Sequence, residues 1–454
     1  MKKVAFHNLG CKVNAYEMEY LQQVFEKSGY EIVPFATKAD IYIVNTCSVT
    51  NIADRKSRQM LHRAKKTNPG ALVVAVGCYV QTDPDGVSAD PLVDLAIGNN
   101  RKREVLSLVE AYLSGEGNIP ALSTSDLSQQ AAYEEMEVTD AAGHTRAHVK
   151  IQDGCDQFCS YCIIPFARGR SRSRKEEDIL REIGVLAKNG YREIVMSGIH
   201  ASSYGIDRME EKTTYNRLAS SGDFTNEALL HLLKEADRVE GIVRIRLGSL
   251  EPRVITEEFL EGLKNIPSFC RHFHLSLQSG SDTVLARMNR HYTAKEYLEK
   301  VRLIRRYFPD AALTADVIVG FPGESGEEFE TTRAFLNEAD LYEVHVFKYS
   351  RRRGTVADRL PCQLTEAQKQ KRSEVLIRES ATRRTAFEKR MIGKEVNVLF
   401  EEAETIGGMR YLTGFTDHYI RCAIPEGEAE TGEPVRCAVR GLLTDEILEV
   451  SREK

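Results

Sequence analysis

One nine-residue stretch, Gly154-Cys155-Asp156-Gln157-Phe158-Cys159-Ser160-Tyr161-Cys162, constrains this chain more than any other. Its three cysteines are separated by three and then two residues, so a short loop can direct three sulfur atoms at one centre. An odd number of thiols cannot pair completely into disulfides. Three thiolates favour zinc or iron–sulfur chemistry, and the loop contains no fourth Cys or His. Cubane clusters normally take four cysteines, so three leave one iron open to another ligand. The alternatives are a zinc loop and three unrelated buried thiols.

Length and composition indicate a folded protein of two to four domains. The chain has 454 residues, of which 42% are hydrophobic and 28% charged. No apolar run approaches the roughly 20 residues that span a bilayer, and the first residues lack a signal-peptide core, so we expect a cytoplasmic protein without membrane association. Ten cysteines in a reducing compartment indicate metal binding or catalysis. The net charge is −5, so nucleic-acid contacts must come from local basic patches.

Residues 1–114 predict an α/β domain. Apolar runs at 3–9, 41–46 and 71–76 alternate with helical patterns at 14–28 and 51–66. Continuous apolar strands between helices are typical of a parallel sheet that is covered on both faces. Residues 115–142 are rich in Ser, Gln, Ala and Glu, and we interpret them as a linker.

Three further cysteines follow these strands. Cys11, Cys47 and Cys78 each lie at or just beyond the end of a predicted strand. Ligands of open α/β sheets bind at the carboxyl ends of strands, and parallel strands place those ends at one edge. We therefore expect these thiols to converge and to form a second three-cysteine metal site with an open iron. The alternative is that they are small buried apolar residues.

Residues 143–375 predict a partial β/α barrel. Six strand patterns lie at 147–152, 193–198, 243–247, 272–277, 315–320 and 342–347. Capping boxes at Thr293 with Glu296 and at Ser325 with Glu328 mark two helix starts. The active site of such a barrel lies at the carboxyl mouth, where the first strand delivers the cysteine loop. Residues 204–226 are polar and are interpreted as an inserted loop.

The C-x3-C-x2-C spacing, with Tyr161 before the last cysteine, resembles the signature of the radical S-adenosylmethionine (radical SAM) superfamily. The resemblance implies a 4Fe-4S cluster whose open iron binds the amino-acid end of S-adenosylmethionine. Glycines and small polar residues at strand ends let backbone groups approach such a ligand, although ordinary turn chemistry explains them equally well. The candidate S-adenosylmethionine contacts are Tyr161, Ser197, Gly198, Ser276, Gln278, Gly320 and Phe321.

Two arginine-rich runs are candidate RNA contacts. Residues 168–175 carry five cations in eight positions just beyond the cysteine loop, and residues 351–353 are three consecutive arginines. Such runs can follow a phosphate backbone. The alternatives are a solvated face and an arginine that holds a substrate carboxylate in a bidentate pair. We predict phosphate contacts from Arg168, Arg170, Arg172 and Arg174.

Residues 376–454 predict a small β-barrel. A polar helix over 365–390, capped by Thr365 and Gln368, leads into short alternating strands at 395–400, 409–415, 418–423, 434–439 and 447–450. This pattern resembles the TRAM domain, an OB-like RNA-binding module. Glu401, Glu402 and Glu404 make the segment no obvious polyanion binder, and a protein–protein module is the alternative.

The three segments together resemble the methylthiotransferase family of radical SAM enzymes. The most specific stretches are Gly10-Cys11-Lys12-Val13-Asn14, Asn45-Thr46-Cys47, Gly77-Cys78, the Cys155 loop with Arg168-Gly169-Arg170, and Leu277-Gln278-Ser279-Gly280. The resemblance implies two 4Fe-4S clusters, one on Cys155, Cys159 and Cys162 and an auxiliary one on Cys11, Cys47 and Cys78. It further implies S-adenosylmethionine as cofactor, the anticodon stem-loop of tRNA as substrate, and an electron donor such as flavodoxin or ferredoxin.

The Gly-Cys-Lys-x-Asn start is similar to the branch that acts on N6-threonylcarbamoyladenosine at tRNA position 37. That branch makes the 2-methylthio derivative after a 5′-deoxyadenosyl radical removes hydrogen from adenine C2. The alternatives are action on isopentenyladenosine-37 or on a ribosomal protein, and a non-catalytic iron–sulfur carrier or redox sensor. No catalytic acid or base is evident, and Cys270, Cys362, Cys422 and Cys437 have no metal-like spacing.

Overall fold

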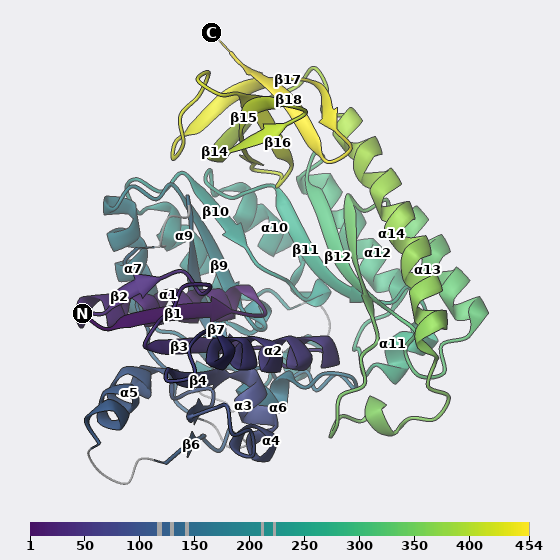
Figure 1. Ribbon diagram of the computed structural model, residues 1–454. Coiled ribbons are helices and arrows are strands. Elements are labelled where there is room, and N and C mark those ends of the chain that lie inside the picture. Colours follow the sequence, from purple (N-terminus) through teal and green to yellow (C-terminus); the bar gives the residue numbers. More distant parts are fainter. Residues whose placement is uncertain (116–119, 128–130, 141–144, 210–212, 221–223, 454) are drawn as a thin grey trace.

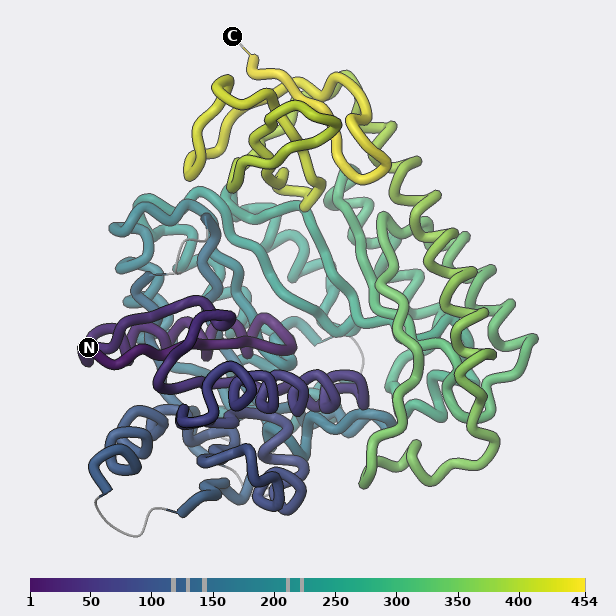
Figure 2. Tube along the Cα trace, viewed as in Figure 1, coloured from purple at the N-terminus to yellow at the C-terminus, as the bar shows by residue number. Residues whose placement is uncertain are grey.

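The computed structural model describes the chain except residues 116–119, 128–130, 141–144, 210–212, 221–223 and 454 (Figure 1). An N-terminal parallel sheet, a central partial β/α barrel and a C-terminal antiparallel β-barrel follow one another along the chain. Figure 2 traces this path from the N-terminal segment at the left to the C-terminus at the top. The predicted α/β architecture is confirmed. In the described part of the chain, no helix has both the length and the apolar character to cross a bilayer.

The N-terminal sheet has the strand order β2-β1-β3-β4-β5-β6, and every pair is parallel. Two apolar clusters, one on each face, bury the central strands completely, which explains their continuous apolar runs. The strands are β1 (Lys3–Asn8), β2 (Glu31–Val33), β3 (Ile41–Thr46), β4 (Leu72–Gly77), β5 (Leu95–Ile97) and β6 (Leu122–Ser123). The helices are α1 (Lys12–Lys27), α2 (Asn51–Thr67), α3 (Cys78–Thr82), α4 (Pro84–Ser88) and α5 (Val105–Ser114).

The segment interpreted as a linker packs against this sheet. It contributes β6, so the sheet extends beyond residue 114. The hydroxyl of Tyr16 donates to the carbonyl of Met136 at 2.6 Å, and Gln23 donates to that of Asp140 at 2.9 Å. Composition alone could not show these contacts, because they involve backbone carbonyls. The predicted boundary at residues 142–143 lies outside the described residues.

Six parallel strands form the central barrel as two hydrogen-bonded groups, β10-β9-β7 and β11-β12-β13, with β8 (Arg172–Ser173) antiparallel on β7. Parallel bridges from Ile245 to Phe269 and from Leu250 to Leu275 join the groups. The strands are β7 (Arg146–Asp153), β9 (Glu193–Gly198), β10 (Arg244–Leu247), β11 (His272–Gln278), β12 (Ala312–Val319) and β13 (Glu343–Lys348).

Helices cover the outside of this barrel, and one large apolar cluster lies between them and the strands. Both predicted capping boxes are formed, at the starts of α12 and α13. The predicted insertion over 204–226 is only partly described; within it, the buried Tyr215 donates to Glu251 at 2.7 Å. The helices are α6 (Ile164–Arg168), α7 (Glu176–Lys188), α8 (Tyr215–Ala219), α9 (Glu227–Asp237), α10 (Glu257–Lys264), α11 (Asp282–Arg287), α12 (Ala294–Tyr307) and α13 (Gly326–Ala339).

A long helix, α14 (Glu366–Lys389), leads to the C-terminal barrel, and the predicted Thr365–Gln368 capping box starts it. The barrel closes in the order β14-β15-β16-β18-β17 around its own apolar core. At Gly414 a Cβ atom would lie 2.1 Å from the carbonyl oxygen of Leu399, so only glycine fits this close strand approach. Its strands are β14 (Glu395–Ile406), β15 (Met409–Thr416), β16 (Arg421–Pro425), β17 (Pro434–Thr444) and β18 (Ile447–Arg452).

The C-terminal barrel closes the amino end of the central barrel. Arg246 donates to the carbonyls of Thr416 and Asp417, both at 3.1 Å, and Arg271 donates to the Asp417 carboxylate at 2.7 Å. Arg271 directly precedes β11, and Arg244, the first residue of β10, also donates to this barrel, to the carbonyls of Phe415 and Asn397. The carboxyl ends of the strands, where the cysteine loop lies, are therefore at the opposite end (Figure 1).

Candidate active site

Cys11, Cys47 and Cys78 lie at one edge of the N-terminal sheet. They follow β1, β3 and β4, which are neighbours in the sheet. Gly10 has φ +108°, and a Cβ atom there would lie 3.1 Å from the sulfur of Cys47, so the Cys11 turn packs directly on Cys47. Burial, together with the charges of Cys78 and Cys11, raises the pKa of Cys47 to about 11. The structure thus brings together the three thiols predicted to converge, here called the strand-end trio.

Cys155, Cys159 and Cys162, the loop trio, follow β7 in a tightly folded turn. A Cβ atom on Gly154, which has φ +71°, would lie 2.0 Å from the carbonyl oxygen of Arg170. Burial raises the pKa of Cys155 well above its usual range, with further contributions from Cys159 and Cys162. Burial and the charge of Cys159 raise the pKa of Cys162 to about 12. With raised pKa values, Cys155 and Cys162 are protonated at neutral pH, so metal binding must release their protons.

The donor chemistry of both trios fits an iron–sulfur cluster with one open iron. Each offers three soft sulfur donors, and a structural zinc site would require a fourth ligand. Among the described residues, no three His, Cys, Asp or Glu side chains are already arranged as ligands around a single metal position. The assignment of the six cysteines as metal ligands therefore rests on donor type, number and convergence.

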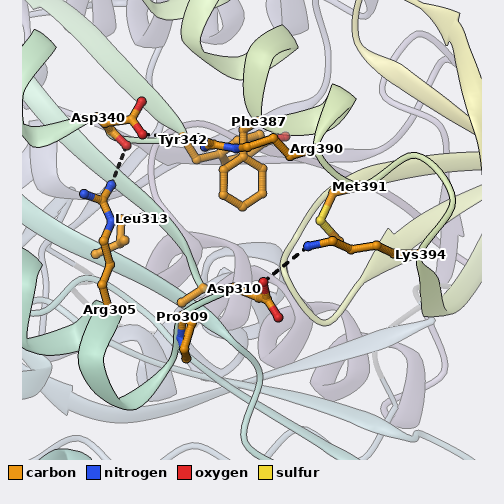
Figure 3. Close-up of a pocket in the computed structure, with 11 residues that line it drawn as sticks. Arg305, Pro309, Asp310, Leu313, Asp340, Tyr342, Phe387, Arg390, Met391 and Lys394 are labelled. Carbon is orange, nitrogen blue, oxygen red and sulfur yellow. Dashed lines mark hydrogen bonds and ion pairs between the residues drawn. The ribbon is translucent and has the colours of Figure 1, made fainter.

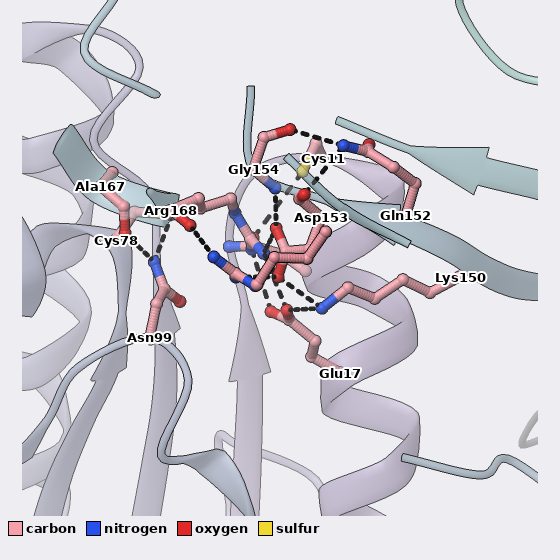
Figure 4. A network of polar contacts seen from close by, with 12 residues as sticks. Cys11, Glu17, Cys78, Asn99, Lys150, Gln152, Asp153, Gly154, Ala167 and Arg168 are labelled. Atoms are coloured by element: carbon pink, nitrogen blue, oxygen red, sulfur yellow. Dashed lines mark hydrogen bonds and ion pairs between the residues drawn. The ribbon is translucent and has the colours of Figure 1, made fainter. Parts of the chain in front are cut away.

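A buried polar network joins the two thiol-bearing segments (Figure 4). Arg168, which follows the cysteine loop, donates to Glu17 at 2.8 Å, to Asp153 at 3.0 Å and to Asn14 at 2.6 Å. Lys150 of β7 donates to the same Glu17 and Asp153 at 2.9 and 2.7 Å. Because Asn14 and Glu17 belong to α1, which starts at Cys11, the network fixes the N-terminal domain to the central barrel at the two trios.

The network carries more cations than carboxylates. Burial opposes ionisation of Glu17, but Arg168, Lys102 and Lys150 together hold its pKa well below its usual range. Net positive charge beside the strand-end trio suits thiolate ligands and a negatively charged cluster. The buried cations are Lys102, Lys150, Arg168 and Arg172, and the carboxylates are Glu17 and Asp153.

The prediction that four arginines contact RNA is wrong for three of them. Arg168, Arg172 and Arg174 are buried; Arg172 lies 3.4 Å from Asp153, and Arg174 pairs with Glu182. Only the side chain of Arg170 is exposed, and its guanidinium lies 4.6 Å from the ring centroid of Phe158. The run looked like a basic surface because the sequence does not show which cations meet buried carboxylates.

Two further side chains donate directly to cysteine sulfurs. Asn99 donates to the sulfur of Cys78 at 3.4 Å and to the carbonyl of Ala167 at 2.7 Å, so it links the strand-end trio to the segment after the cysteine loop. Arg290 donates to the sulfur of Cys159 at 3.2 Å. Neither residue was predicted, because both lie far in sequence from the cysteines they contact.

A cavity of about 220 Å³ lies where the two segments meet at the carboxyl mouth of the barrel. Val49 and Thr50, just beyond Cys47, form one side, and Cys162 with the start of α6 forms another. The ends of β11, β12 and β13 complete the wall with Gln278, Asp316, Ile318, Phe347, Lys348, Tyr349 and Ser350. A ligand in this cavity would contact residues of both the N-terminal domain and the central barrel.

Only some of the predicted S-adenosylmethionine contacts line this cavity. Tyr161 and Gln278 do, and Gln278 has φ +73°, a strained conformation of the kind that clusters at functional sites. Gly320 (φ +72°) donates its N–H to Glu324. The side chain of Phe321 is completely buried against Tyr349 and Met288, so packing occupies it instead of a ligand. Ser197 and Gly198 end β9, and Ser276 lies near the end of β11, with β10 between these two strands.

A histidine–carboxylate pair lies on the inner face of the barrel. His274 Nε2 is 3.3 Å from Asp316 Oδ2, and the ring of His345 stacks on His274 at 5.6 Å between centroids. Asp316 lines the cavity, so this pair is a candidate proton donor or acceptor there. The two residues lie on adjacent strands 42 positions apart, and no local pattern could have revealed the pair.

A larger cavity, of about 340 Å³, lies at the other end of the central barrel (Figure 3). Residues from the start of β12, from α12 and from the end of α14 line it, and its charged groups are paired, as Lys394 with Asp310 at 3.3 Å. No cysteine lines it. Size therefore does not identify the reactive site, and the smaller cavity, which Cys162 and the residues just beyond Cys47 line, is the better candidate.

Comparison with known proteins agrees with this geometry. Residues 149–336 match the model of the radical SAM superfamily, and residues 3–98 match the uncharacterized protein family UPF0004. The chain is 39% identical to threonylcarbamoyladenosine tRNA methylthiotransferase MtaB of Bacillus subtilis, over 97% of this chain and 94% of that protein. It is 36% identical to MtaB of Aquifex aeolicus, over 96% of this chain and 100% of that protein. It is 33% identical to a tRNA-2-methylthio-N(6)-dimethylallyladenosine synthase of Syntrophus aciditrophicus, over 88% of this chain and 84% of that protein.

Among solved structures, the radical S-adenosylmethionine methyltransferase TsrM from Kitasatospora setae shares the fold, with a TM-score of 0.54 at 15% identity over 76% of this chain and 73% of that one. At that identity the likeness concerns architecture alone. The full-length relatives carry the conclusion that this chain belongs to the methylthiotransferase family of radical SAM enzymes.

Proposed function

We propose that this protein converts N6-threonylcarbamoyladenosine at position 37 of tRNA to its 2-methylthio derivative. The observation that carries the proposal is the cavity between two three-thiol segments, in a chain similar over nearly its full length to proteins named for that reaction. Relatives named for dimethylallyladenosine are also similar, at 33% identity, and make that nucleoside the second candidate.

The residues have distinct roles in this proposal. The loop trio holds a 4Fe-4S cluster to which S-adenosylmethionine binds, and the strand-end trio holds the auxiliary cluster. When bound, these groups supply radical formation and the sulfur and methyl to be transferred. The chain contributes placement: the network around Arg168 and Glu17 fixes the distance between trios, and the walls of the cavity exclude water from the reacting base.

The partners follow from the same chemistry. The substrate is a base in the anticodon stem-loop, a single-stranded loop of the kind that proteins read by unstacking bases. Reductive cleavage of S-adenosylmethionine needs an electron donor, for which we propose flavodoxin or ferredoxin in the cytoplasm. The C-terminal barrel has the small closed form of a TRAM-like, OB-like module.

Nucleoside mass spectrometry of tRNA tests the proposal. A deletion strain should lose 2-methylthio-N6-threonylcarbamoyladenosine and accumulate its unmethylthiolated precursor, and the wild-type chain should restore it. Loss of the methylthio-isopentenyl nucleoside instead would identify the second candidate. Unchanged tRNA nucleosides would point to a ribosomal protein as the substrate. Absence of 5′-deoxyadenosine after anaerobic reconstitution would leave a non-catalytic iron–sulfur carrier or redox sensor as the function.

A further inference from the structure

We propose that the outer face of helix α2 binds the phosphate backbone of the tRNA, beside the cavity that receives the base. The inference rests on the proposed function and adds to it the surface that holds the substrate. The outer face of α2 then takes the place of the arginine run after the cysteine loop as the main phosphate-binding element, because the members of that run are mostly buried.

The amphipathic pattern of α2 determines which residues face outward. Ser57, Leu61 and Ala64 form its buried stripe against the N-terminal sheet. The helix carries six cations and a single carboxylate, Asp54. Arg55 and Lys66 lie opposite the buried stripe at 100° per residue, and the exposed cations of the helix are Arg55, Lys56, Arg58, Arg63 and Lys66.

Most of these cations lack a protein counter-charge. Over the described part of the chain, Arg55, Lys56, Arg63 and Lys66 form no ion pair. Two exposed arginines of α12 differ in this respect: Arg302 lies 2.9 Å from Glu338 and Arg306 lies 3.1 Å from Glu257. These four unpaired cations of α2 therefore form a surface of uncompensated positive charge, which attracts a polyanion.

The basic face begins at the cavity. Thr50, the N-cap residue of α2, lines the cavity together with Cys162. The N–H of Asn51 donates to Ser350 at 2.9 Å, and buried Arg352 pairs with Asp54 at 2.6 Å, which neutralises the only carboxylate of the helix. At about 1.5 Å per residue, the cations extend from roughly 8 Å to roughly 24 Å from Thr50.

Exposed apolar side chains lie between the cavity and the cations. Val49, Ile52 and Phe347 are each about half exposed, at 49%, 49% and 48%. Val49 and Phe347 also line the cavity. An aromatic or apolar rim beside a basic track is what a looped RNA strand requires, because its bases stack while its phosphates pair with cations.

The C-terminal barrel is unsuited to the same role in this chain. Between residues 395 and 454 there are 13 Asp and Glu against 6 Lys and Arg. Two of its exposed arginines pair with its own carboxylates, Arg410 with Glu426 and Arg436 with Glu395, and a third, Arg440, donates to the hydroxyl of Ser451. It also lies at the amino end of the central barrel (Figure 1), whereas the carboxyl ends of β11, β12 and β13 line the cavity.

Charge reversal on the reconstituted full-length enzyme tests the inference. The test variant combines Arg55→Glu with Lys66→Glu, and the matched control combines Arg302→Glu with Arg306→Glu on α12, which changes net charge equally. A second comparison, Arg436→Glu with Arg440→Glu, probes the C-terminal barrel. Binding to unmethylthiolated tRNA is measured by filter retention from low to moderate salt, together with 5′-deoxyadenosine release in the absence of tRNA.

We expect the tRNA affinity of the α2 variant to fall tenfold or more at about 100 mM salt. The slope of log affinity against log salt concentration should become shallower by roughly 0.7–0.9 for each phosphate contact that is lost. The control and the barrel variant should stay within about threefold of wild type, and release of 5′-deoxyadenosine without tRNA should be unchanged in all. Equal losses in the α2 and α12 variants, or a larger loss in the barrel variant, would overturn the inference. Binding is measured independently of whether the methylthio product forms, so a failure of the proposed function can be distinguished from a failure of this inference.

Discussion

The loop trio and the strand-end trio supply the same donors but are assembled in different ways. The loop trio lies within eight residues, and its turn has a local hydrogen bond from the N–H of Cys162 to the carbonyl of Cys159 at 2.9 Å. The strand-end trio spans 67 positions and exists only because three parallel strands end side by side. Its surroundings come partly from another domain, through Arg168 and through the contact of Asn99 with Ala167. The first site is thus a property of one loop, and the second depends on domain packing.

The largest expected effect comes from the loop trio. Cys159→Ala should reduce both 5′-deoxyadenosine release and methylthio transfer to background, because the cluster that binds S-adenosylmethionine loses a ligand. Anaerobic reconstitution followed by chromatography of both products measures this, and iron content should fall by about half. Cys270→Ala, at a buried thiol outside both trios, is the control and should retain both activities. Persistent 5′-deoxyadenosine in Cys159→Ala would contradict the assignment.

A change in the strand-end trio should separate the two activities. Cys47→Ala should abolish the methylthio product and keep 5′-deoxyadenosine release within a few-fold of wild type, because only the auxiliary ligands are disturbed. The same paired assay measures it. If both activities fell together, the two trios would not have the separate roles proposed for them.

The buried network that connects the trios should be important for stability. Arg168→Met leaves Glu17 and Asp153 with fewer counter-charges in the interior, and breaking a buried ion network in this way typically costs about 3–5 kcal/mol. Thermal or denaturant unfolding of the apoprotein measures the loss. The exposed neighbour Arg170→Met provides a matched control and should change stability by less than about 1 kcal/mol. Equal effects would show that the network is not a structural link between the domains.

The smallest effect is expected from the hydrogen bond to Cys78. Asn99→Ala removes an N–H···S bond of roughly 1 kcal/mol and should lower the reduction potential of the auxiliary cluster by about 20–60 mV, because such bonds favour the reduced form. Redox titration followed by electron paramagnetic resonance measures both clusters. The potential of the loop-trio cluster should stay unchanged, and a shift of both would assign Asn99 a general effect on the fold.

Much of this architecture was predictable because local signals are strong where they depend on neighbouring residues. The capping boxes at Thr293, Ser325 and Thr365 all form, and β3 and β9 have the predicted bounds. Strands of two or three residues, such as β5 and β6, were missed because they are too short to show a pattern. The arginine run after the cysteine loop was misread because burial and ion pairing are not local properties.

The three-part fold, the loop trio and the placement of three more cysteines at strand ends could be read from the residues alone, because each depends on spacing along a continuous stretch of chain. Which cations remain without a carboxylate partner became visible only after the sheets and helices were packed together. The tertiary structure buried Arg168 against Glu17 and left Arg55 and Lys66 on an open helix face beside the cavity. It also paired His274 with Asp316 across two strands. The physical reason is that charges and thiols interact through space, and the distances between residues far apart in sequence are set by how sheets and helices pack.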